Sequence, residues 1–338
     1  MLSVTPVTRM PDAHPYQNLT PDRILDAVET CRCRCDGRLQ ALNSYENRVY
    51  QVWLDDGSAR VAKFYRPGRW TDAAILEEHA FALELAEHEI PVVAPLAFDD
   101  GRTLHEHGGY RFALYPRRPG RSPELESHDT LTWLGRFIGR IHAVGALRPF
   151  THRLALDIER FGRESSRFVL ENGFVAPDLR DTYRSVVDDV LERVGRCYAR
   201  AGRAKMIRLH GDCHAGNILW TDEGPHFVDL DDACMGPAIQ DLWMCLAGDR
   251  RMMEGQLEAL IAGYREFCDL DPAEIVLVEA LRTLRMIHYA GWLARRWEDP
   301  AFPANFPFFN TQRYWQDHIL ALREQAALLD EPPLELAA

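Results

Sequence analysis

One polar stretch in the second half of the chain constrains its fold and chemistry most. Residues 209–219 read LHGDCHAGNIL, and residues 227–232 read FVDLDD. Asp212 precedes Asn217 by five residues, and Asp229 ends a short apolar run. Phosphoryl transfer requires a carboxylate that orients an attacking hydroxyl, together with an amide oxygen and a second carboxylate that hold Mg²⁺ against ATP. The spacing therefore predicts Asp212 as the catalytic base and Asn217 and Asp229 as metal ligands.

The overall composition is that of an ordinary globular protein. A chain of 338 residues can form one large domain or two lobes, each with its own core. The net charge of −12 argues against nucleic acid or an anionic membrane as the main partner. No apolar run approaches the ~20 residues of a membrane span, and no signal peptide is evident. We therefore expect a cytoplasmic monomer.

The N-terminal region contains a predicted hairpin with a polar loop before it. Residues 48–54 and 59–65 are β-rich runs joined by Asp-Asp-Gly, which favours a tight turn. The preceding residues 42–47 read LNSYEN, and such a small polar loop could cover a nucleotide phosphate, with Ser44 in it. Neither G-x-G-x-x-G nor a P-loop motif occurs, so the loop alone is a weak indication.

Lys63 lies inside the second of these strands, on the same face as Val61. One interpretation is a lysine that contacts the α- and β-phosphates and is held by a glutamate of the next helix. The other is an edge-strand lysine whose ammonium reaches solvent. Residues 71–88 form the next predicted helix, which carries Glu77 and Glu78. With the downstream motif in view we favour the phosphate lysine, and we choose Glu78 as its partner.

The rest of the sequence predicts an α+β, bilobal fold. Two more strands are expected at 94–98 and 110–115, and residues 116–123, rich in Pro, Gly and Arg, form a linker. A small nucleotide-binding lobe, 1–116, is thus followed by a larger and mostly helical catalytic lobe, 117–338. Adenine would lie in the crease against the backbone of Ala113 to Tyr115. In the second lobe, helices are predicted at 129–147, 181–200, 255–267, 272–296 and 312–329, an irregular segment at 161–179, and short strands at 206–209, 218–220 and 227–228.

Several residues in or near the motif allow other interpretations. His210 and His214 would need a helix to share a zinc ion, and the glycines at 211 and 216 argue against one, so we prefer a histidine that braces the loop. Asp229-Leu230-Asp231 also resembles a phosphatase nucleophile motif, although its position in the chain is unusual for one. Asp241 is interpreted as a structural carboxylate that receives loop N–H groups.

Three cysteines alternate with arginine, at positions 31, 33 and 35. They could bind a metal or sense redox state. No second ligand pair lies at zinc spacing, so a partly buried strand or helix end is the preferred interpretation.

Three blocks of this sequence together resemble a known family. They are residues 43–50 (NSYENRVY), 63–70 (KFYRPGRW) and the 209–220 motif. The H-G-D-x-H-x-x-N pattern is typical of the aminoglycoside phosphotransferase and choline kinase superfamily. The longer blocks resemble the bacterial stress response kinase A family, over about residues 15 to 330.

The resemblance implies a protein-kinase-like fold and Mg-ATP-dependent phosphorylation of protein Ser or Thr in a stress response. It places Asp212 as the base, Asn217 and Asp229 on the metal, Lys63 on phosphate and Ser44 in the phosphate-covering loop. The chain lacks the glycine-rich loop, Asp-Phe-Gly and Ala-Pro-Glu of ordinary protein kinases. A small-molecule kinase for an amino alcohol, aminoglycoside or sugar therefore remains the alternative, and a nucleotide-binding module without catalysis ranks below both.

Overall fold

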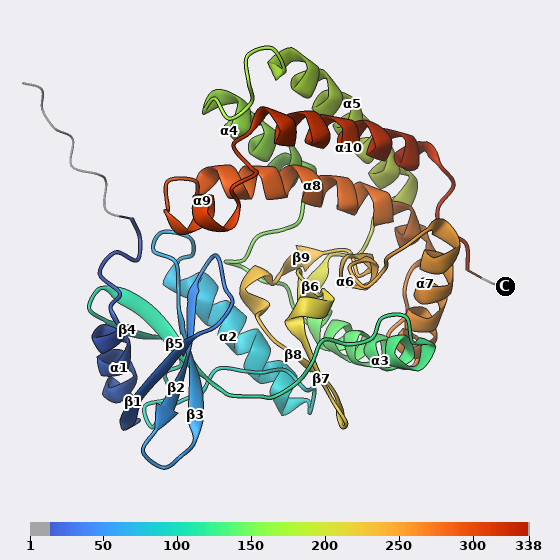
Figure 1. Cartoon of the computed structure of the whole chain (residues 1–338). Coiled ribbons are helices and arrows are strands. Elements are labelled where there is room, and N and C mark those ends of the chain that lie inside the picture. Colours follow the sequence, from blue (N-terminus) through green and yellow to red (C-terminus); the bar gives the residue numbers. More distant parts are fainter. Residues whose placement is uncertain (1–13, 337–338) are drawn as a thin grey trace, which may run out of the picture.

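A five-stranded antiparallel sheet forms the N-terminal part of the molecule, which is known here as a computed structural model describing residues 14–336. The strand order is β1-β2-β3-β5-β4 (Figure 1). Even-numbered side chains of the central strands, such as Ala62 and Phe64, pack with helix α1 (Pro21–Thr30). Odd-numbered ones, such as Tyr65 and Ala113, pack with helix α2 (Asp72–Glu87), so Lys63 lies on the α2 face. The strands are β1 (Cys35–Ala41), β2 (Arg48–Leu54), β3 (Ala59–Phe64), β4 (His105–His107) and β5 (Tyr110–Pro116).

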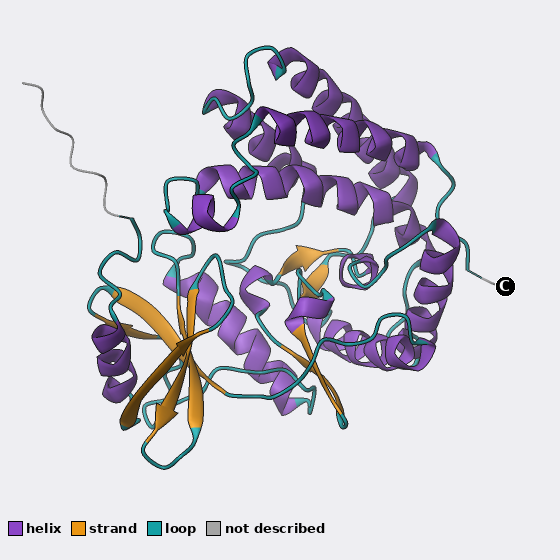
Figure 2. Ribbon diagram, in the orientation of Figure 1, coloured by secondary structure: helices purple, strands orange, loops and turns teal. Residues whose placement is uncertain are grey.

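The second part is mostly helical (Figure 2). Its helices surround a large apolar core. Helix α8 crosses this part and packs against α4, α5 and α10. Helix α3 packs along α7. The helices are α3 (His128–Gly145), α4 (Ser165–Glu171), α5 (Arg180–Ala201), α6 (Ile239–Trp243), α7 (Arg250–Tyr264), α8 (Val278–Arg295), α9 (Ala301–Asn305) and α10 (Gln312–Asp330).

Two small two-stranded sheets lie between the helices and the N-terminal part (Figure 1). Strand β6 (Ile207–Leu209) pairs with β9 (Cys234–Gly236), and β7 (Ile218–Thr221) pairs with β8 (Gly224–Phe227). The loop that leaves β6 and the loop that enters β9 therefore lie side by side. These are the two segments of the polar motif, so pairing of distant strands brings them together.

The predicted α+β bilobal architecture is confirmed, but strands β1, β4 and β9 were not predicted, and two segments differ from the expectation. The strand expected at 94–98 is absent, because Pro95 has no N–H to donate and this segment makes only one bond to β5, from Leu96 N to Leu114 O at 2.7 Å. The segment 161–179, expected to be irregular, contains a π-helical turn, Glu159–Glu164, that continues into α4. No helix within residues 14–336 is long and apolar enough to cross a membrane.

The three alternating cysteines occupy the end of a helix and the start of a strand, as preferred from the sequence. Cys31 caps α1, and Cys35 begins β1. Burial raises the pKa of all three thiols, so the thiolate that would bind a metal or react with an oxidant is disfavoured.

Candidate functional site

The two motif loops contact each other directly. Gly211 has φ +83°, and a Cβ at this position would overlap the carbonyl oxygen of Asp232, so only glycine allows the loops to approach this closely. Asn217 Nδ2 donates to the Asp212 carbonyl at 2.9 Å and to its Oδ2 at 3.3 Å. The next link is from Val228 N to Asn217 O at 3.0 Å. A continuous series of hydrogen bonds thus connects residue 212 with the segment that carries Asp229.

A buried carboxylate holds the loop at residues 210–217 in place through backbone hydrogen bonds. Asp241, in α6, accepts hydrogen bonds from the backbone N–H groups of His210 and Gly211, each at 2.9 Å. Its Oδ2 also lies 3.0 Å from Nε2 of His142. His210 in turn donates from Nε2 to Val228 O at 2.9 Å. The bracing roles expected for Asp241 and His210 are therefore confirmed.

Asp212 points to a partly open surface, with its side chain 20% exposed. Arg285 Nη1 of α8 lies 2.6 Å from its Oδ1, and His214 Nε2 lies 3.4 Å from its Oδ2. Burial alone would raise the pKa of Asp212, but the hydrogen bond from His214 and the charge of Arg285 outweigh it and hold the pKa well below its usual value. The group is a carboxylate at neutral pH, as acceptance of a hydroxyl hydrogen bond requires.

Asp229 has an unusual backbone conformation directly after β8. Its φ of 58° and ψ of 66° are left-handed values that few residues other than glycine adopt, and such strain is often found at functional positions. The turn leaves the Asp229 side chain half-exposed. Asn217 Oδ1 accepts no hydrogen bond from the residues that the structure describes, because both Asn217 contacts above use its Nδ2. The side chains thus retain oxygen atoms of the type that Mg²⁺ prefers, and the donor set fits a divalent ion.

Lys63 contacts both the motif and helix α2. Its Nζ lies 2.9 Å from Asp229 Oδ1, 3.2 Å from Asp231 Oδ1 and 3.7 Å from Glu78 Oε1. Burial alone would lower the pKa of this ammonium, but the carboxylates raise it well above its usual value. Glu77 faces away and accepts backbone hydrogen bonds from residues 151–153. Of the two candidate glutamates, Glu78 is therefore the partner of Lys63.

Two arginines with little exposed surface, which the sequence analysis missed, complete the charge balance around Lys63. Arg69 contacts the carboxylates of Asp231 and Asp232. Arg153 lies 3.8 Å from Glu78 Oε2 and donates from Nε to Ala233 O at 2.9 Å. Arg69 falls within the conspicuous RPGRW block, which was a usable signal. Arg153 lies outside any recognisable motif, so only the structure reveals its role.

The predicted phosphate-covering loop connects the two parts of the molecule. The hydroxyl of Ser44 stabilises the loop itself, since it donates to Asn47 O at 3.2 Å and accepts from Val49 N at 3.3 Å. Glu46, two residues further, accepts a hydrogen bond from Trp292 Nε1 in α8 at 2.7 Å and contacts Arg296. The loop is therefore anchored across the cleft by its glutamate.

The strand expected to meet adenine is paired for its whole length. Ala113 is opposite Lys63 and Tyr115 is opposite Val61 in the β3–β5 ladder. Tyr65 N donates to Arg111 O at 2.9 Å, and alternation then directs the backbone groups of residues 113 and 115 toward β3 as well. An adenine ring beside β5 would therefore meet backbone groups that do not bond to β3 only from Pro116 onward.

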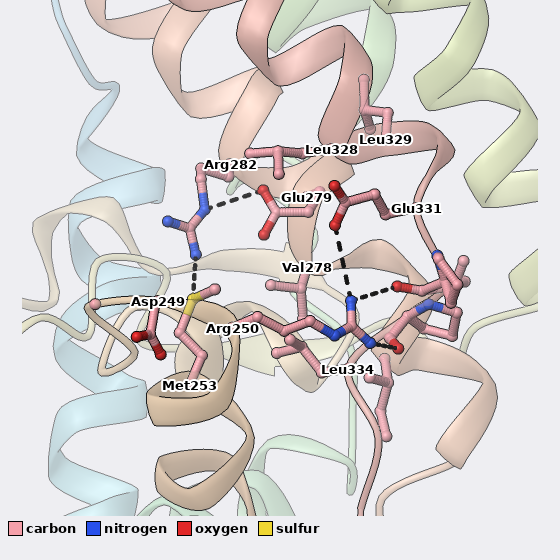
Figure 3. Close-up of a pocket in the computed structure, with 15 residues that line it drawn as sticks. Asp249, Arg250, Met253, Val278, Glu279, Arg282, Leu328, Leu329, Glu331 and Leu334 are labelled. Carbon is pink, nitrogen blue, oxygen red and sulfur yellow. Dashed lines mark hydrogen bonds and ion pairs between the residues drawn. The ribbon is translucent and has the colours of Figure 1, made fainter.

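A separate cavity of about 240 Å³ lies between α7, α8 and the C-terminal segment (Figure 3). Its arginines pair with carboxylates of the same cavity: Arg282 lies 3.3 Å from Glu279, and Arg250 lies 4.0 Å from Glu331. Arg250 also donates to Pro332 O at 2.8 Å. None of the motif residues lines this cavity, so we place the candidate site at the cleft between the two lobes, on chemical grounds.

The chain is similar to known phosphotransferases over most of its length. A model of the phosphotransferase enzyme family matches residues 38–275. Stress response kinase A of Salmonella choleraesuis is 46% identical over 96% of this chain and 98% of that protein. The chain belongs to the phosphotransferase enzyme family, and within it to the stress response kinase A family. It is therefore an ATP-dependent phosphotransferase.

Other members and more distant structures extend the comparison. The Escherichia coli K12 stress response kinase A is 45% identical over 96% of this chain and 98% of its own length. A Salmonella typhimurium relative, 46% identical with the same coverage, is named serine/threonine protein kinase RdoA. Among solved structures, amicoumacin kinase hAmiN has a TM-score of 0.70 at 17% identity, covering 91% of this chain and 93% of that chain. Likeness at this identity shows the shared phosphotransferase fold.

Proposed function

We propose that this member of the stress response kinase A family is a Mg-ATP-dependent Ser/Thr protein kinase that acts in a stress response. The carrying observation is that hydrogen bonds join Asp212 to Asn217 and Asn217 to Val228, and that Asp229, the next residue, contacts Lys63. The names of the relatives at about 46% identity support a protein acceptor and a role in stress.

The side chains have distinct proposed roles. Asp212 orients the acceptor hydroxyl and receives its proton, and the braced loop fixes the position of its carboxylate. Asn217 and Asp229 would hold the divalent ion, which supplies neutralisation of phosphate charge when bound. Lys63 binds phosphate oxygens, and Glu78 holds its ammonium in the cleft. Ser44 shapes the loop above the phosphates. We place the boundary between nucleotide-binding and catalytic lobes at residues 116 and 117, with adenine against the chain from Pro116 onward, because the backbone groups of Ala113 and Tyr115 are already paired with β3.

Acceptor screening tests this proposal. Purified protein is incubated with radiolabelled ATP and Mg²⁺, Mn²⁺ or Ca²⁺, and with either Ser/Thr peptides or small hydroxyl compounds such as amino alcohols, aminoglycosides and sugars. We expect label on peptide Ser or Thr and the highest rate with Mg²⁺. Efficient labelling of a small molecule, with none of any peptide, would contradict the protein-kinase assignment and favour the small-molecule alternative.

A further inference from the structure

The acceptor side of the cleft carries a cation that the proposed catalysis does not require. Arg285 Nη1 lies 2.6 Å from Asp212 Oδ1, yet the Arg285 side chain is 44% exposed. The contact is a close ion pair without hydrogen-bond alignment, so Asp212 Oδ1 has no hydrogen-bond donor among the described residues. This oxygen is buried beside the guanidinium, so an acceptor hydroxyl can reach it only when Arg285 moves aside, and the guanidinium itself is partly exposed to solvent.

Positive charge gathers on this side of the cleft, in a protein whose net charge is −12. Its centre is His288, one helical turn beyond Arg285 in α8, with Nδ1 3.3 Å from Ser165 Oγ. Burial lowers the pKa of the His288 imidazole to about 3, and nearby guanidinium charges contribute to the lowering. They belong to Arg295, Arg296, Arg285 and Arg69.

Carboxylates of the protein pair with three of these four arginines. Arg296 contacts Glu46, and Arg69 contacts Asp231 and Asp232. Arg295 has only neutral partners in the described chain: Ser165 Oγ at 3.5 Å and the Glu164 carbonyl oxygen at 3.3 Å. Arg285 has a single carboxylate, that of Asp212, which an acceptor must approach. Arg285 is therefore a solvent-exposed cation directly beside the carboxylate that an acceptor must approach.

Aromatic side chains extend this surface. Tyr289 follows Arg285 by one turn of α8, is 41% exposed and stacks on Trp292 at 5.7 Å. Tyr45, in the loop from the other lobe, is 38% exposed and packs on Phe306 at 4.9 Å. Trp292 also contacts Phe306, at 5.8 Å, so both tyrosines belong to one cluster. Cations beside exposed aromatic rings suit an extended peptide better than a small hydrophilic molecule.

We propose that Arg285 is a specificity-determining residue that binds an acidic side chain of the acceptor peptide, next to the Ser or Thr to be phosphorylated. The acidic group of the peptide pairs with the guanidinium of Arg285 in place of Asp212. The acceptor hydroxyl then donates a hydrogen bond to Asp212 Oδ1. This inference rests on the proposed protein-kinase function and names its substrate class: Ser or Thr flanked by Asp or Glu. The same charge disfavours cationic acceptors, because a like charge beside Arg285 would be repelled.

The test uses the full-length protein and short synthetic peptides with one central Ser whose neighbours are Asp, Ala or Lys. For wild type we expect kcat/KM to rank Asp over Ala over Lys, with about a tenfold advantage of Asp over Ala that falls at high salt. Arg285→Gln should bring the Asp/Ala ratio close to one, and Arg285→Glu should favour the Lys peptide. Arg285→Lys keeps the charge and should restore part of the preference.

Arg323→Gln provides the matched control, because Arg323 is an exposed arginine on α10 and should leave the ranking unchanged. ATP binding and circular dichroism check that each variant is folded. If Arg285→Gln does not fold, the wild-type ranking and Arg285→Lys still decide. Peptide phosphorylation without an acidic preference, or with the same preference in Arg285→Gln, would overturn this inference alone. No peptide phosphorylation by wild type would overturn it together with the protein-kinase proposal.

Discussion

The two sides of the cleft hold their carboxylates in different ways. On the nucleotide side, Asp231 and Glu78 are buried, 3% exposed each, and are paired with the equally enclosed Lys63. On the acceptor side, Asp212 is paired with an arginine that is 44% exposed. Enclosed ion pairs are costly to disrupt, whereas exposed ones contribute little to stability. The difference indicates a rigid site for the nucleotide and an adaptable one for the acceptor.

The sharpest test of the acceptor side is Asp212→Asn. An amide cannot take up the hydroxyl proton, so we expect phosphoryl transfer to fall about 1,000-fold or more, while ATP affinity stays within roughly twofold. The rate of labelled phosphate transfer measures the loss of activity, and calorimetric titration with ATP measures the affinity for the nucleotide. Asp222→Asn, in the exposed turn between β7 and β8, is the control. Turnover close to wild type in Asp212→Asn would refute the role assigned to Asp212.

Lys63→Met tests whether the nucleotide side depends on its enclosed charges. Removal of the ammonium leaves Asp229, Asp231 and Glu78 close together without their shared cation. We expect the free energy of unfolding to fall by about 3–5 kcal/mol, together with much weaker ATP binding. Adding Glu78→Gln should recover part of the stability, because it removes one repelling charge. Urea unfolding measures both variants, and wild-type stability in Lys63→Met would contradict the enclosed network.

A pH titration gives a smaller effect on the same side. Burial, opposed by the charge of Lys63, raises the pKa of Glu78 from 4.5 to about 7. The folded protein therefore binds the Glu78 proton more tightly than the unfolded chain does. The stability that this proton contributes is fully present below the pKa of Glu78 in the unfolded chain, and it is lost as the pH rises through the pKa of Glu78 in the folded protein. Between about pH 5 and about pH 8 we expect wild type to lose roughly 1–3 kcal/mol of unfolding free energy relative to Glu78→Gln. Parallel pH curves for the two proteins would show that Glu78 titrates normally.

The smallest expected effect is on stability, from Arg285→Gln. Because this arginine is 44% exposed, solvent screens its ion pair with Asp212, and we expect the free energy of unfolding to change by about 1 kcal/mol or less. Thermal and urea unfolding of Arg285→Gln and of Lys63→Met under the same conditions measure the two changes. A loss as large as that of Lys63→Met would remove the contrast between the rigid and the adaptable side.

Local sequence patterns predicted most of the fold. The hairpin at residues 55–57 and the long helices α2, α3, α5 and α10 follow from turn residues and apolar periodicity, and the structure has them within two residues or so of the predicted ends. Strand β1 has no clear alternation, because it is an edge strand whose side chains are mostly exposed or half-buried. The segment 94–98 is apolar, but Pro95 prevents a ladder.

The candidate site was predicted where the residues are close in sequence or belong to a motif. Asp212, Asn217, Asp229 and Lys63 come together as the family resemblance implied, although their roles remain to be tested. Arg285 and Arg153 were missed, because an arginine in a helix or an irregular segment is usually solvated, and only tertiary packing determines which one faces a carboxylate.

A crystal structure with Mg²⁺ and a non-hydrolysable ATP analogue tests the central claim most directly. The account predicts that Asn217 Oδ1 and the Asp229 carboxylate hold the ion, and that Lys63 Nζ leaves Asp229 for a phosphate oxygen. It also predicts Asp212 facing the terminal phosphate, with Arg285 still exposed at the opening of the cleft. A nucleotide bound elsewhere, or an ion held without Asn217 and Asp229, would contradict it.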